Sequence, residues 1–176
     1  MKNHDSALCC LVLFSLPALA QKKAADSAPM TNQQFVDFAA QTDMVEANLG
    51  QLAQDVASSQ PVKDYGKMLA TDHTADYQKL QSMATQAGLT VPTAIDAEHD
   101  KSMIGPMHAL KGGAFDHKYI AEMVTGHTRA LAIYNKEADT AQDAAFKTYA
   151  QDAIPVLQKH LDDAKAIQQG KSPTGL

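Results

Sequence analysis

The amino-acid sequence predicts an all-α fold built from four long helices. Three observations support this prediction. Apolar residues recur at steps of three and four along four extended segments, which is the signature of one buried helical face. No segment shows the alternation of apolar and polar residues that is typical of a strand. Residues that break helices separate the segments, at Ser58 to Pro61, at Gly88 and at Gly112-Gly113.

The first predicted helix begins at Thr31, where Thr31 and Gln34 can form a capping box. Pro61 suits the first turn of the second helix, and Gly88 suits its C-terminal cap. The apolar stripe of the first helix is Phe35, Phe38, Val45, Leu49, Leu52 and Val56, and that of the second is Val62, Tyr65, Leu69, His73, Tyr77, Leu80 and Met83.

The stretch from Gly88 to Gly113 is a long connection with a short helix of its own. Thr93 and Asp96 predict a second capping box, which would begin a helix over Ala94 to Leu110. Pro106 should bend or split this helix, and Gly112-Gly113 should end it. The two remaining long helices are predicted over Ala114 to Asp139 and over Gln142 to Gln168.

Short joints within each pair of long helices predict two antiparallel hairpins. The connection between the hairpins is long enough to cross the bundle. One long crossover of this kind is the connectivity of ferritin-like folds. We therefore expect a ferritin-like four-helix bundle over residues 31–169, with a crossover that carries a short extra helix.

The first twenty residues have the pattern of a cleaved signal peptide. Lys2 and His4 precede the apolar stretch ALCCLVLFSL, and Ala18-Leu19-Ala20 gives the small-residue cleavage pattern. Cys9 and Cys10, the two cysteines of the chain, would leave with it. We expect a flexible leader over residues 21–30 and a flexible tail over residues 170–176. The predicted location is the periplasm.

Charge and hydropathy narrow the classes of partner. The formal net charge is −5, and no basic patch of the kind that nucleic acid requires is present. No segment after the predicted signal peptide is long and apolar enough to span a membrane. A protein partner or a homo-oligomer remains open.

Three histidines lie on the apolar stripes of three different predicted helices: His73, His127 and His160. Glu46 lies on the first helix. At a rise of about 1.5 Å per residue, all four fall within roughly two turns of the middle of the bundle. A buried polar group is costly unless another side chain or a metal satisfies it. The four residues are therefore our candidate metal ligands.

Neighbouring residues could support such ligands, and the residue types limit the metal. Three imidazoles and a carboxylate suit zinc, copper or iron, and zinc and copper are our candidates. A di-iron site is not expected, because no Glu-x-x-His motif occurs in the chain. The supporting residues are predicted to be Asp43, Asp72, Asp76, Met123 and Tyr134.

Two other interpretations stay open at this point. The histidines could form a purely structural polar network, in an envelope or stress-related protein that acts through partner binding. Catalysis is not favoured, because no phosphate-binding loop, nucleophile elbow or His-Glu-x-x-His motif is present. Beside these two interpretations stands the first one, an exported protein that binds a metal ion or a small ligand at the histidines.

Five segments between about Thr31 and Gln168 together carry a resemblance to a known family. They are FVDFAAQTDMVEANLGQL from Phe35, KDYGKMLATDHTADYQKL from Lys63, TAIDAEH from Thr93, FDHKYIAEMVTGHTRAL from Phe115 and IPVLQKHL from Ile154. With these segments the chain resembles the bacterial family known as domain of unknown function 4142. The resemblance implies an exported, ferritin-like helical bundle and leaves the activity open.

Overall fold

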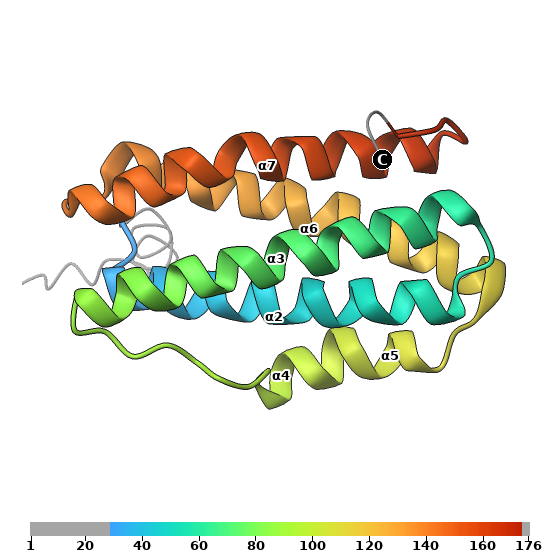
Figure 1. Cartoon of the computed structure of the whole chain (residues 1–176), viewed down its shortest axis with the longest axis horizontal. Helices are drawn as coiled ribbons and strands as arrows, with labels where there is room; N and C mark the ends of the chain where they lie inside the picture. Colours follow the sequence, from blue (N-terminus) through green and yellow to red (C-terminus); the bar gives the residue numbers. More distant parts are fainter. Residues whose placement is uncertain (1–28, 174–176) are drawn as a thin grey trace, which may run out of the picture.

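The computed structural model describes residues 29–173, and within this range the chain forms helices and their connections, with no strand. Four long helices lie side by side (Figure 1). They are α2 (Asn32–Val56), α3 (Gln60–Gln86), α6 (Gly112–Thr140) and α7 (Ala144–Gln168). The all-α prediction is confirmed for this part of the chain. The predicted signal peptide, most of the leader and the last three residues of the tail lie outside it.

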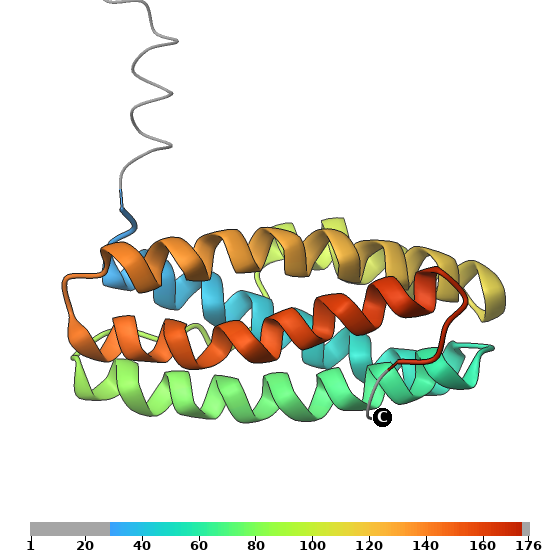
Figure 2. The same cartoon turned by 90° about the horizontal axis from the view of Figure 1, so that it is seen from above.

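The long helices pair as two hairpins. α2 packs mainly against α3, and α6 packs mainly against α7; further contacts join α3 to α7 and α2 to α6. Figures 1 and 2 show the short joint of each hairpin at opposite ends of the molecule, with the α3–α6 connection running back along its length. Every long helix therefore contributes one face to the space between the hairpins.

Local sequence signals explain where these helices begin and end. The predicted capping box is present: Gln34 N–H donates to Thr31 Oγ1 at 3.2 Å, and Thr31 N–H donates to Gln34 Oε1 at 2.9 Å. α3 ends where Gly88 takes a φ of +71°, a conformation that glycine adopts without strain. Leu89 N–H then donates to Ala84 O, which closes a Schellman motif.

The crossover differs in detail from the prediction. It contains α4 (Ala97–His99), a π-helical turn (Asp100–Ile104) and α5 (Gly105–His108). The predicted capping box at Thr93 was wrong: Asp96 itself caps α4, accepting a hydrogen bond from His99 N–H at 2.8 Å. Asp is itself a strong N-cap residue. The split before Pro106 agrees with the prediction, while Gly112 begins α6 rather than ending the short helix.

A polar layer divides the interior into two apolar clusters. One cluster joins the start of α2 to the end of α3 and contains Phe35, Leu80 and Phe146. The other lies toward the joint between α2 and α3 and contains Leu49 and Phe115. The buried polar side chains of this layer are Asp43, Glu46, His73, His127 and His160. None of the helices in the described part is long and apolar enough to cross a membrane.

Candidate metal centre

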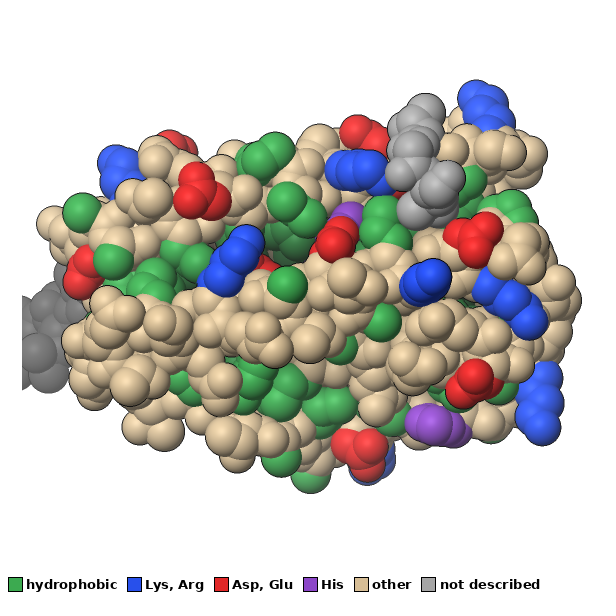
Figure 3. All heavy atoms as spheres, in the orientation of Figure 1, with side chains coloured by type: hydrophobic (Ala, Val, Ile, Leu, Met, Phe, Trp, Pro, Cys, Tyr) green, Lys and Arg blue, Asp and Glu red, His purple; other side chains and the backbone are tan. Residues whose placement is uncertain are grey.

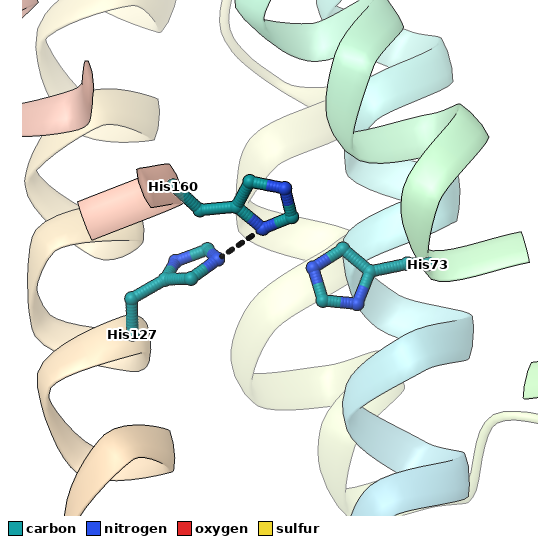
Figure 4. A group of neighbouring side chains, drawn as sticks. All are labelled: His73, His127 and His160. Atoms are coloured by element: carbon teal, nitrogen blue, oxygen red, sulfur yellow. Dashed lines mark hydrogen bonds between the residues drawn. The ribbon is translucent and has the colours of Figure 1, made fainter. Parts of the chain in front are cut away.

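Three histidine side chains from three helices meet in the polar layer. His73 comes from α3, His127 from α6 and His160 from α7, and each residue is at most 3% exposed. One ring nitrogen of each lies within 4.8 Å of the corresponding atom of the other two. His127 Nε2 and His160 Nδ1 are 3.3 Å apart (Figure 4). Figure 4 also shows the ring of His73 turned toward this pair.

The other nitrogen of each ring is held by an acceptor outside the cluster. His73 Nδ1 lies 2.9 Å from Asp43 Oδ1, and His160 Nε2 lies 2.9 Å from Asp72 Oδ2. His127 Nδ1 lies 2.9 Å from the main-chain carbonyl of Met123. Histidines that bind metals almost always donate their second N–H to a carboxylate or a main-chain carbonyl, which fixes the tautomer and the orientation of the ring.

These acceptors determine which nitrogens carry lone pairs. A carbonyl or an ionised carboxylate only accepts, so each ring places its proton on the nitrogen that faces the acceptor. In the neutral rings, His73 Nε2, His127 Nε2 and His160 Nδ1 are then free of hydrogen. His73 Nε2 is buried and has no hydrogen-bond partner. In these tautomers the facing nitrogens of His127 and His160 both carry lone pairs, which repel each other. A cation bound between the two nitrogens would remove this repulsion.

The spacing of the rings is close to that of metal ligands. Two ligands of a tetrahedral ion with metal–nitrogen bonds of about 2.0–2.1 Å lie about 3.3 Å apart. The His127–His160 pair has this spacing of 3.3 Å. The nitrogen that His73 offers lies within 4.8 Å of both of these atoms, so the three rings could hold one ion together.

Burial and charge set the protonation of the cluster. Burial, with the charges of His73 and His160, lowers the pKa of His127 to about 3. Burial and the charge of His73 lower the pKa of His160 to about 4, against the opposing effect of Asp72. Burial also acts to lower the pKa of His73, but the hydrogen bond and charge of Asp43 outweigh it and raise that pKa. His73 beside Asp43 therefore binds a proton more tightly than an ordinary histidine, and His127 and His160 bind one less tightly.

Glu46 lies beside the cluster rather than between its rings. Its Oε1 is 4.0 Å from His127 Nδ1, the nitrogen turned away from the other rings, and it faces the backbone of Gly126. Its Oε2 is buried without a hydrogen-bond partner. Burial raises the pKa of Glu46 to about 7 and that of Asp43 to about 6. Glu46 is thus, with Asp43, a second buried carboxyl beside the cluster.

The remaining predicted residues lie around this centre. Asp76 accepts a hydrogen bond from the hydroxyl of Tyr149 at 2.6 Å, and the ring of Tyr134 lies against that of Tyr149. Met123 contributes its carbonyl, while its side chain is fully buried in an apolar cluster.

Sequence reasoning missed two tyrosines, Tyr149 and Tyr65. The hydroxyl of Tyr65 donates to the carbonyl of His160 at 3.1 Å. Tyr149 follows Phe146 by three residues and precedes Ala153 by four, so helical periodicity could have placed it on the inner face of α7.

A cleft between α3 and α7 reaches the cluster from the surface. Its volume is about 330 Å³. Figure 3 shows a hollow between these helices, with acidic side chains beside it and histidine visible inside it. The lining residues are Asp72, His73, Ala75, Asp76, Lys79, Tyr149, Asp152, Ala153, Val156, Leu157 and His160.

The fold and the site define a helical protein with a buried cluster of three histidines. Residues 17–167 match the family described as domain of unknown function (DUF4142). Because the match covers most of the chain, the protein belongs to this family, which confirms the resemblance found in the sequence.

Comparison of folds gives one informative neighbour. A structure described as CopM in the Cu(II)-bound form is similar, with a TM-score of 0.68. The aligned region covers 81% of this chain and 99% of CopM, at 14% sequence identity. At this identity the likeness shows a shared helical fold. No curated protein matches the sequence.

Proposed function

We propose that this protein binds one transition-metal ion through His73 Nε2, His127 Nε2 and His160 Nδ1. The observation that supports this most directly is that all three rings are held through their other nitrogen by an acceptor outside the cluster. That arrangement leaves three lone pairs converging on one point. Imidazole nitrogen suits copper and zinc, and these are the candidate metals.

The orphaned nitrogen of His73 favours this proposal over a purely structural network. In a structural network, each buried polar atom should find a hydrogen-bond partner within the protein. His73 Nε2 has none, and Glu46 Oε2 and Asp43 Oδ2 also lack one. A metal ion would use the nitrogen, and its charge would offset the buried carboxylates. We assign Glu46 the role of balancing the charge of the ion. A direct bond from Glu46 to the metal would require its side chain to turn.

The fold and its similarity to CopM are consistent with the same function. We propose that the two hairpins and the long crossover form a ferritin-like four-helix bundle, a fold that holds metals between facing helices. CopM is a copper-bound protein of similar fold, which makes copper the first ion to test. We also propose that residues 1–20 are a signal peptide and that the protein acts in the periplasm.

Equilibrium binding of Cu²⁺ and Zn²⁺ tests the proposal. Calorimetric titration should give one ion per chain for wild type, and His73→Ala, His127→Ala and His160→Ala should each lose that site. His117→Ala is the matched control, because His117 lies on α6 as His127 does but is exposed. Wild-type protein that binds neither ion, or histidine variants that bind as well as wild type, would exclude this site.

Replacing the hydrogen-bond acceptor of His73 should weaken metal binding without removing a ligand. Asp43→Asn keeps the shape of the side chain but loses the charge that orients Nδ1–H, so we expect the affinity to fall about 10–100-fold. Asp55→Asn makes the same change on an exposed position of α2 and should leave the affinity unchanged. Equal affinities for the two variants would contradict the role given to Asp43.

A further inference from the structure

The three histidines are buried, so a metal ion needs a path to them. His127 and His160 are 1% exposed and His73 is 3% exposed. The cleft between α3 and α7 is lined at its inner end by His73 and His160. His73 Nε2, which has no hydrogen-bond partner, belongs to a side chain that lines this cleft. The cleft therefore leads from solvent to two of the three proposed ligands.

The charges along the cleft favour a cation. Three carboxylates line it, from Asp72, Asp76 and Asp152, against the single ammonium group of Lys79. Like charges that line a cleft with low-dielectric walls raise the local concentration of an ion of opposite sign and speed its association. The side chain of Asp72 is 40% exposed and also accepts a hydrogen bond from His160 Nε2, so it connects the solvent-facing part of the cleft to a ligand.

Apolar side chains complete the walls of the cleft. Ala153 and Leu157 are buried, whereas Val156 is 44% exposed and is the exposed large hydrophobic residue of the described part of the chain. Its position on the lining allows the width of the cleft to be changed at a site where the core is not disturbed.

We infer that the cleft between α3 and α7 is the passage through which the metal ion reaches and leaves the histidine cluster, with Asp72, Asp76 and Asp152 drawing the cation in. The inference rests on the metal binding proposed above. A passage lowers the free-energy barrier to metal uptake and to metal release alike. Narrowing it must therefore slow uptake and release by the same factor and leave the equilibrium affinity unchanged.

Stopped-flow kinetics on the protein test this inference, with Cu²⁺ as the probe for uptake and excess EDTA for release. Val156→Trp should slow both rates at least about tenfold at unchanged affinity. Gln151→Trp places the same bulk on an exposed position of α7 that does not line the cleft, and it should keep the wild-type rates.

A charge reversal gives an independent readout. Asp152→Lys should slow uptake about tenfold at low ionic strength, and the difference should shrink near 0.15 M salt, where the screening length is about 8 Å. Asp162→Lys changes the net charge equally, on an exposed position of α7 outside the cleft, and should have a much smaller effect.

The two proposals fail in different ways. Wild-type protein that binds no Cu²⁺ overturns both the site and the passage. Wild-type protein that binds Cu²⁺ while Val156→Trp and Asp152→Lys keep wild-type rates overturns the passage alone. Equal slowing in the cleft variants and their controls also overturns it. Far-UV circular dichroism confirms that each variant keeps its helices.

Discussion

The three histidines differ in the nitrogen that each offers, and the difference follows from where the acceptors lie. His73 and His127 are held through Nδ1, by Asp43 and by the carbonyl of Met123, so both offer Nε2. His160 is held through Nε2 by Asp72 on the neighbouring helix α3, so it offers Nδ1. The acceptor, rather than the ring, thus determines which lone pair faces the centre.

Glu137 is a buried carboxyl outside this centre, and it should make stability depend on pH. The side chain is 3% exposed, its Oε1 has no hydrogen-bond partner, and burial raises its pKa above the ordinary 4.5. The folded state then holds the proton of Glu137 more tightly than the unfolded state does. The stability that protonated Glu137 contributes is therefore fully present below pH 4.5 and is lost as the pH rises through the folded-state pKa.

Glu137→Gln should remove the loss of stability that accompanies the ionisation of Glu137, because the amide stays neutral at every pH. We expect the variant to gain stability relative to wild type between pH 4 and pH 7, measured by urea unfolding. Glu122→Gln, on a more exposed position of the same helix, is the control and should show no such gain. A difference between Glu137→Gln and wild type that does not change with pH would contradict the prediction.

At the level of elements, α2 and α3 pack closely because two glycines face each other. A Cβ added at Gly50 would lie 2.5 Å from the carbonyl oxygen of Gly66, and one added at Gly66 would lie 2.6 Å from Cβ of Ala53. Backbone cannot give way as a side-chain tip can, so a methyl group at Gly50 would push the helices apart.

We expect Gly50→Ala to destabilise the fold by about 1–3 kcal/mol, the usual cost of overpacking. Gly113→Ala is the control: it lies near the start of α6, nothing is within 4 Å of its added Cβ, and it should be neutral or stabilise by up to about 1 kcal/mol. Thermal or urea unfolding measures both. Equal effects at the two positions would mean that close packing at Gly50 does not limit the fold.

At the level of the whole molecule, the polar layer lies where the two apolar clusters meet. The proposed ligands come from α3 in one hairpin and from α6 and α7 in the other. A bound ion would therefore link the two hairpins across the part of the core where charged and polar groups replace hydrophobic contacts.

Metal binding should consequently stabilise the whole fold. An ion that binds the folded state alone adds about 2.7 kcal/mol at a free concentration of 100 times its dissociation constant. The melting temperature should rise with added Cu²⁺ or Zn²⁺ and return to its starting value with EDTA. The same scans on His127→Ala should show no rise. A rise that persists in this variant would point to binding elsewhere.

Much of the fold could be predicted because helix periodicity and caps are local properties of the sequence. The step of three and four residues identified all four long helices, and the Thr31–Gln34 box gave the start of α2. The crossover was predicted less well, because Thr93 and Asp96 can both cap a helix and their choice depends on how the loop packs. Gln41 illustrates this packing: its side chain, on α2, donates a hydrogen bond to Ala94 O and accepts one from Asp96 N–H.

Helix periodicity alone predicts that the three histidines lie on inner helical faces. Counting residues along each helix predicts that they and Glu46 lie at a similar height in the bundle. Which of these groups meet is seen in the folded structure alone. It placed the three rings together, set Glu46 beside the far nitrogen of His127, and opened a cleft between α3 and α7. Those outcomes depend on the rotation and spacing of helices that are distant in the chain, and local sequence patterns do not specify them.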